Sequence, residues 1–78
     1  MNTCVICEYG WIIIGVKDKS SNSGTMILHE ASVVRRWTNG KGIGGIALAE
    51  NKKEYTLDAI GDVNIRQSKV LFEIPCEW

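Results

Sequence analysis

A chain of 78 residues can enclose only a small apolar core, and this limit restricts every fold open to it. A domain of this size buries about 60–65% of the surface that its unfolded chain exposes. Such domains usually gain further stability from disulfides, from a metal or from self-association. Three cysteines are too few for a disulfide framework. We therefore expect one domain, residues 1–78, that forms a homo-oligomer.

The charge and hydropathy of the chain disfavour general electrostatic binding to nucleic acid or to an acidic membrane, and a membrane span. Nine basic and nine acidic residues give a net charge of zero, whereas general binding to nucleic acid or to an acidic membrane needs an excess of Lys and Arg. The apolar run at residues 11–14 is far shorter than the roughly 20 residues of a membrane span. With an odd number of cysteines and no secretory signal pattern, the chain is expected to be cytoplasmic.

Five stretches rich in β-branched and apolar residues predict strands. They are residues 3–8, 11–17, 25–37, 55–65 and 70–74. The third stretch is expected to contain a bulge near Ala31 and Ser32. Polar residues 20–24 and 66–69 are typical of the turns that connect antiparallel strands.

Residues 42–50 predict one short helix, because apolar residues recur there at spacings of three and four. Four glycines in residues 40–45 weaken a helix, so packing would have to hold it in place. The predicted order is β-β-β-α-β-β. This order is an α+β domain with a mainly antiparallel five-stranded sheet or partly closed barrel. One helix covers only part of such a sheet, which makes Trp11, Ile13, Phe72 and Trp78 candidates for a subunit interface.

The residue types that carry catalysis or bind metals do not form a recognisable site. Cys4 and Cys7 have C-x-x-C spacing, but residues three apart on a strand point to opposite faces, so we interpret them as buried structural thiols. His29 is the single histidine, and Glu30 beside it on a strand faces away from it. We therefore predict no metal, no cofactor and no enzymatic activity.

Residues 35–45 combine cations, an indole and glycines. Arginine binds phosphate through several donors, tryptophan stacks on bases, and the free amides of a helix start attract anions. The predicted ligand site contains Arg35, Arg36, Trp37, Asn39, Lys41, Gly42, Gly44 and Gly45. In the alternative interpretation, the glycines only permit close packing of the helix on the sheet.

Several short motifs together resemble a family of small uncharacterised proteins carried by phages and prophages. That family has a segment of the type A-R-R-x-W before a short helix and a final strand of the type E-I-I-P-C. The matching residues are Leu28-x-x-Ala31, Arg35-Arg36-Trp37, Ile46-Ala47 and Ile74-Pro75-Cys76. The resemblance covers residues 5–77 and implies a small intracellular viral protein that acts by stoichiometric binding.

The leading hypothesis is a homo-oligomer that sequesters a phosphate-bearing small molecule, such as a nucleotide signal of bacterial defence. One alternative is a protein-interaction module that inhibits a host or phage protein through its exposed apolar and edge-strand surface. A second alternative is binding of single-stranded nucleic acid through Trp37 and the arginines, although the zero net charge disfavours it.

Overall fold

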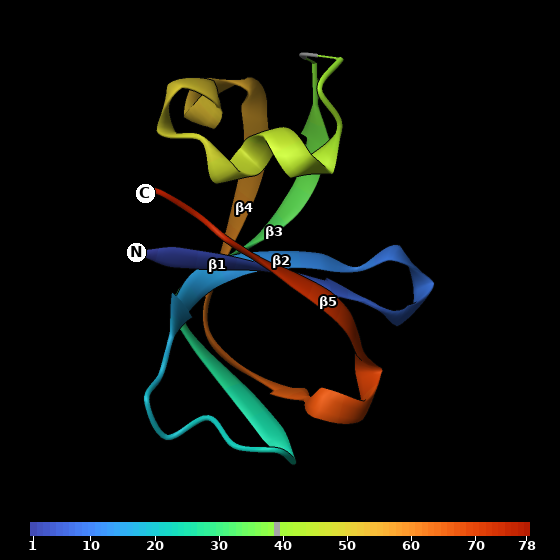
Figure 1. Cartoon of the computed structure of the whole chain (residues 1–78), viewed down its shortest axis with the longest axis vertical. Helices are drawn as coiled ribbons and strands as arrows, with labels where there is room; N and C mark the ends of the chain where they lie inside the picture. Colours follow the sequence, from blue (N-terminus) through green and yellow to red (C-terminus); the bar gives the residue numbers. More distant parts are fainter. Residues whose placement is uncertain (39) are drawn as a thin grey trace.

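The computed structural model describes residues 1–38 and 40–78, which form five strands and four short 3₁₀ segments (Figure 1). In chain order these elements are β1 (Asn2–Cys7), η1 (Glu8–Gly10), β2 (Ile12–Lys17), β3 (Thr25–Trp37), η2 (Ile43–Ala47), η3 (Ala49–Glu54), β4 (Tyr55–Arg66), η4 (Gln67–Lys69) and β5 (Val70–Pro75).

All strand pairs are antiparallel, and the strand order across the sheet is β4-β3-β2-β1-β5. The predicted antiparallel five-stranded sheet is thus confirmed. The sheet is open, with β4 and β5 as its two edges, and no pairing between these edges closes it in the described residues. Pro75 lies at the end of an edge strand, where a missing N–H donor is tolerated.

The long strands β3 and β4 bend together at one place. Glu30 has a φ of 50° and Gly61 a φ of 80°, and the register between the strands shifts on both sides of Ala31. The bulge predicted near Ala31 is therefore present. A bulge bends the strand that carries it and increases its twist. Gly15 of β2 lies against the bend, because a Cβ built there would be 3.0 Å from the Ala31 Cβ.

Apolar residues occupy both faces of the sheet, because alternate residues of a strand point to opposite sides. Strand β1 contributes Cys4 and Ile6 to one cluster and Val5 and Cys7 to the other. The first cluster, here called the covered core, contains Cys4, Ile6, Ile14, Val34, Ile46, Tyr55 and Cys76. The second, here called the pocket-side core, contains Val5, Cys7, Met26, Leu28, Ala31 and Ile65.

Residues of η2 and the last residues of the chain pack into the covered core, and η3 lies beside η2 above the sheet (Figure 1). Trp78 packs against it and donates its Nε1–H to the carbonyl of Ile46 at 2.8 Å. Of the four residues expected to lie uncovered, Ile13 and Trp78 are half-buried, whereas Trp11 and Phe72 remain 59% and 51% exposed.

The predicted helix over residues 42–50 is wrong. Two 3₁₀ segments, η2 and η3, occupy this region, and Leu48 between them is extended, with φ −91° and ψ 128°. Gly42, before η2, has a φ of 71°, which is outside the helical range. The glycines supply too little helix propensity to continue a regular helix past these breaks. The fold is thus β-rich, with 3₁₀ turns in place of one α-helix in the described residues.

Candidate binding site

The predicted ligand segment begins on β3 with two exposed arginines and a half-buried tryptophan. Arg35 Nε lies 3.0 Å from Asp58 Oδ2 of the neighbouring strand β4. Trp37 packs against the covered core, and its ring centroid is 5.9 Å from that of Tyr55. Part of the indole therefore already contacts protein, which reduces the surface that it can offer to a base.

The glycine-rich part of the segment is held by the side chains of Asn51 and Tyr55. Asn51 is 1% exposed; its Nδ2 donates to the Gly45 carbonyl at 2.9 Å, and its Oδ1 accepts from Lys41 Nζ at 2.8 Å. The hydroxyl of Tyr55 donates to the Gly42 carbonyl at 2.6 Å. These hydrogen bonds fasten η2 and η3 to the start of β4.

Two of the predicted ligand glycines differ in their surroundings. A Cβ added to Gly45 would lie 2.7 Å from the Tyr55 hydroxyl and 2.9 Å from Lys41 Cβ, whereas one added to Gly44 would meet nothing within 4 Å. Close packing thus accounts for glycine at position 45. Asn39 lies outside the described residues. Ligand binding by residues 35–45 stays a prediction.

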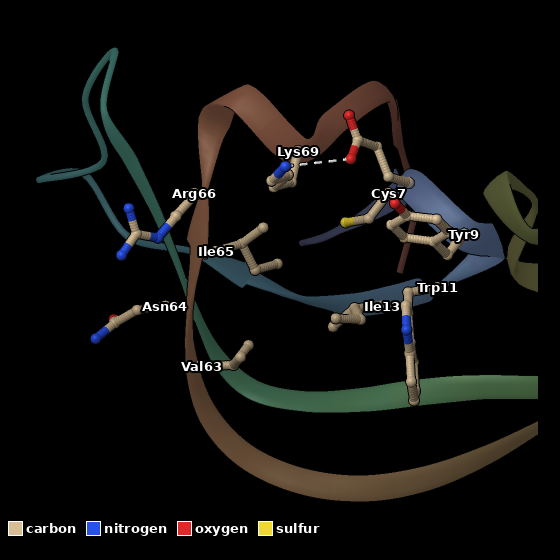
Figure 2. Close-up of a pocket in the computed structure, with 10 residues that line it drawn as sticks. Cys7, Tyr9, Trp11, Ile13, Val63, Asn64, Ile65, Arg66 and Lys69 are labelled. Atoms are coloured by element: carbon tan, nitrogen blue, oxygen red, sulfur yellow. Dashed lines mark ion pairs between the residues drawn. The ribbon is translucent and has the colours of Figure 1, made fainter.

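A pocket of about 380 Å³ opens from the other face of the sheet, at the pocket-side core (Figure 2). Its ten lining residues come from two segments far apart in the chain, residues 7–13 and residues 63–69. Ligand sites in proteins commonly have volumes of about 300–1,000 Å³ and largely apolar walls. This pocket fits that description in size.

Apolar side chains from β2 and β4 form the inner walls of the pocket. Ile13, Val63 and Ile65 point into it, whereas Asn64 and Arg66 turn away from it (Figure 2). This alternation is the one that a strand imposes on successive residues. Two cations line the pocket, and the side chain of Arg66 is directed outward from the cavity.

The rim of the pocket is aromatic on one side and carries an ion pair. Trp11 is 59% exposed and Tyr9 95% exposed. Lys69 Nζ lies 3.4 Å from Glu8 Oε2, and the pair bridges η4 and η1. Because Glu8 neutralises Lys69, the part of the rim near Tyr9 and Trp11 offers apolar surface with little net charge.

Tyr9 has an unusual conformation for so exposed a side chain. Its φ is 64°, in the left-handed region where a side chain other than glycine costs about 1–2 kcal/mol. Gly10 follows with a φ of 79°, so the turn between β1 and β2 places two successive residues in this region. Strained, exposed residues of this kind cluster at ligand contacts, which makes the Tyr9 turn a candidate contact surface.

The sequence did not reveal this pocket. Trp11 and Ile13 were expected to be uncovered, but nothing connected them with residues 63–69, because the two segments meet through the pairing of β5 with β1 and the bend of β3 and β4. The available signal was the Tyr9-Gly10-Trp11 turn, since two aromatic residues around a glycine in a hairpin turn have no core to enter.

His29 forms a separate polar cluster with two aspartates. Its Nε2 contacts Asp18 Oδ2, and its Nδ1 lies 3.2 Å from Asp62 Oδ1. Hydrogen bonds to Asp18 and then to Asp62 raise the pKa of His29. Hydrogen bonds from Ser20, and then from His29, hold the pKa of Asp18 below its usual range. The cluster ties the end of β2 to the bend in β3 and β4.

This cluster lacks the geometry of a hydrolytic triad. Both imidazole nitrogens of His29 face carboxylates, and the Ser20 hydroxyl donates to Asp18 rather than to the imidazole. A triad requires the base to contact the nucleophile directly. We therefore assign the cluster a structural role.

The three cysteines are free and buried. Burial, followed by repulsion from Cys76 and Cys7, raises the pKa of Cys4 to about 12. Burial also raises the pKa of Cys7 and of Cys76. Because the thiolate is the reactive form, these cysteines are poor nucleophiles.

The described residues contain no metal centre and no membrane-spanning helix, and the comparisons with known proteins assign no family. No group of three or more His, Cys, Asp or Glu side chains is arranged to hold a metal ion within residues 1–38 and 40–78. Over the same residues, no helix has the length and apolar character needed to cross a membrane. Comparison with protein-family models, with curated proteins and with solved structures found no match.

Proposed function

We propose that this chain is a binding domain whose pocket receives an aromatic or branched apolar group of its ligand. The observation that carries the proposal is the pocket of about 380 Å³ with apolar walls and the exposed Trp11 and Tyr9 at its rim. Exposed rings beside an apolar cavity are typical of recognition surfaces, because each buries a large area with few rotatable bonds.

Two features support binding without turnover. The nitrogens of His29 are held by Asp18 and Asp62, so the imidazole has no obvious route to a substrate proton. The thiol at the pocket, Cys7, has a raised pKa because of burial. A nucleophile in a working site needs the opposite, a lowered pKa or an adjacent base.

A panel of small compounds tests the proposal. Indole, p-cresol, adenosine and adenosine monophosphate are titrated into the labelled protein, and backbone amide shifts are followed by NMR. We expect the ring compounds to shift the amides of residues 7–13 and 63–69. Trp11→Ala should weaken this response, whereas Phe72→Ala should not, because Phe72 is an exposed ring that does not line the pocket.

The same panel separates this proposal from nucleotide capture at residues 35–45. Shifts confined to residues 35–45, and present only with adenosine monophosphate, would favour the phosphate site predicted from the sequence. Sequestration of a nucleotide signal, a viral origin, a cytoplasmic location and homo-oligomerisation stay predictions, and light scattering measures the last. If none of the four compounds shifts the pocket amides, the proposed function is wrong.

A further inference from the structure

The pocket lies beside an unpaired strand edge. Strand β4 pairs with β3 on one side and is the outermost strand of the sheet on the other. Four successive residues of β4, residues 63–66, line the pocket. A ligand in the pocket thus has free backbone donors and acceptors within reach, which a purely apolar cavity does not offer.

The register shows which peptide groups of β4 point to the free side. Gln67 N donates to the Gly24 carbonyl at 3.1 Å, and Ile65 lies opposite Met26 in the same ladder. In an antiparallel ladder, alternate residues turn their N–H and C=O toward the same neighbour. Ile65 therefore bonds toward β3, and Asn64 and Arg66 present their N–H and C=O groups outward.

The charges at this edge favour an acidic partner. Arg66 is exposed and forms no ion pair or hydrogen bond through its side chain with any described residue. The other cation at the pocket, Lys69, is neutralised by Glu8. Asn64, two residues before Arg66 and on the same outward face, adds an exposed amide. The face that Arg66 shares with Asn64 thus carries one unpaired positive charge, and the carboxylate of Asp62, further along the same face, is held by His29 at 3.2 Å.

We propose that an extended peptide from a partner protein adds as a strand to the free edge of β4, with an apolar side chain in the pocket and an acidic side chain in the adjacent position, next to Arg66. The proposal rests on the proposed function, because the apolar side chain is the group that enters the pocket. Apolar and acidic side chains alternate in this peptide because successive residues of a strand point to opposite faces. One face of the peptide is directed to the pocket, and the other is directed to the side of Arg66.

A second copy of the chain would offer its free edge β5 to the β4 edge, and it fits there less well than such a peptide. The other free edge, β5, does carry the exposed Leu71 and Phe72. However, the acidic residue beside them, Glu73, is already paired with Lys17 at 3.2 Å, and Pro75 has no N–H to donate. An added strand is stabilised by opposite charges across the pair and by a complete set of backbone hydrogen bonds. The β5 edge offers neither a free acidic side chain nor a complete set of N–H donors.

The probe is the peptide acetyl-Thr-Glu-Phe-Glu-Val-Thr-amide, and its binding is measured by NMR titration. Two further peptides carry a backbone N-methyl group, one on the phenylalanine and one on the glutamate after it. Adjacent residues of an added strand direct their N–H groups to opposite sides. We expect one methylated peptide to lose binding and the other to retain it. Equal binding of all three peptides would show that no strand is added.

Charge reversal tests the role of Arg66. Arg66→Glu should weaken binding of the acidic peptide by about fivefold to tenfold and strengthen binding of a peptide with lysine in place of glutamate. Arg36→Glu is the matched control, because Arg36 is also an exposed arginine on a strand but does not line the pocket. Equal effects of the two substitutions would overturn the proposal. Circular dichroism confirms that each variant is folded.

The outcomes distinguish this inference from the proposed function. If indole and p-cresol bind the pocket but the peptide binds no better than they do, the proposed function stands and the added strand is wrong. If none of them binds, both fail. If the protein self-associates and Arg66→Glu alone abolishes the association, the occupant is a second copy, and the partner peptide is wrong.

Discussion

The two apolar faces of the sheet are covered in different ways. Over the covered core, η2 and η3 lie close to the sheet and are fixed by the buried Asn51. Over the pocket-side core, the bend of β3 and β4 leaves a cavity with Trp11 at its rim. The cation-rich and glycine-rich segment, which has the composition of a binding site, is on the first side, where Gly45 is closely packed. The turn at Tyr9 has the composition of a connector, and it lies at the rim of the pocket.

The largest effect is expected on the covered side, from Asn51→Ala. This substitution removes two part-buried hydrogen bonds, leaves the Gly45 carbonyl with only the 3.3 Å bond from Leu48 N, and creates a cavity. We expect a loss of about 3 kcal/mol in the free energy of unfolding, measured by urea denaturation. Asn64→Ala, at an exposed asparagine, should change it by less than about 0.5 kcal/mol. Similar values for the two variants would show that Asn51 does not fasten η2.

The two glycines of the predicted ligand site separate packing from binding. Gly45→Ala should destabilise the fold by about 2 kcal/mol, because the new Cβ would lie 2.7 Å from the Tyr55 hydroxyl. Gly44→Ala, with nothing within 4 Å, should be neutral or stabilising by up to about 1 kcal/mol. Thermal unfolding measures both. Loss of nucleotide binding in a stable Gly44→Ala variant would instead support the ligand site.

On the pocket side, Tyr9→Gly should raise stability and lower binding together. Glycine relieves the positive φ of 64°, so we expect a gain of about 1 kcal/mol in the free energy of unfolding. Indole and peptide binding should fall, because the exposed ring is removed from the rim. Phe72→Gly removes an exposed ring that does not line the pocket and should leave binding intact. A binding loss in the Phe72 variant would contradict the assignment.

The smallest effect is expected from the exposed His29 cluster, as a dependence of stability on pH. The raised pKa of His29 means that its contribution is complete below the ordinary value of 6.5 and is lost as pH rises through the folded pKa. The lowered pKa of Asp18 means that its contribution is present above 3.8 and is lost at lower pH. Urea midpoints should therefore be highest between these two values. His29→Asn should remove the decline above 6.5, and an unchanged profile would contradict this interpretation.

The strands were predictable, because alternation of apolar and polar residues is a local property. Even the bulge near Ala31 could be located from a polar interruption in a long extended stretch. The two 3₁₀ segments that replace the predicted helix over residues 42–50 were not predictable. The spacing of Ile43, Ile46 and Ala47 fits a helix, and this spacing gives no sign of the break at the extended Leu48.

The pocket could not be derived from the sequence for a different reason. Its two lining segments, residues 7–13 and 63–69, are separated by most of the chain. Their approach depends on the pairing of β5 with β1, which places Cys7 opposite Val70, and on the bend of β3 and β4 near Ala31 and Gly61. Local patterns do not specify such a bend. The role of Asn51 was hidden likewise, because an asparagine among lysines and glutamates is typical of an exposed turn.

The position of β1 between β2 and β5 has a consequence for synthesis of the protein. The backbone hydrogen bonding of β1 is completed by β5, the last strand of the sheet in chain order. Near the same ladder, Asn2 N donates to the Trp78 carbonyl at 2.6 Å. At roughly 5–20 residues per second, the growing chain carries β1 with one edge unpaired until residues 70–78 appear. Until then, the free edge of β1 is open to pairing with a strand of another chain.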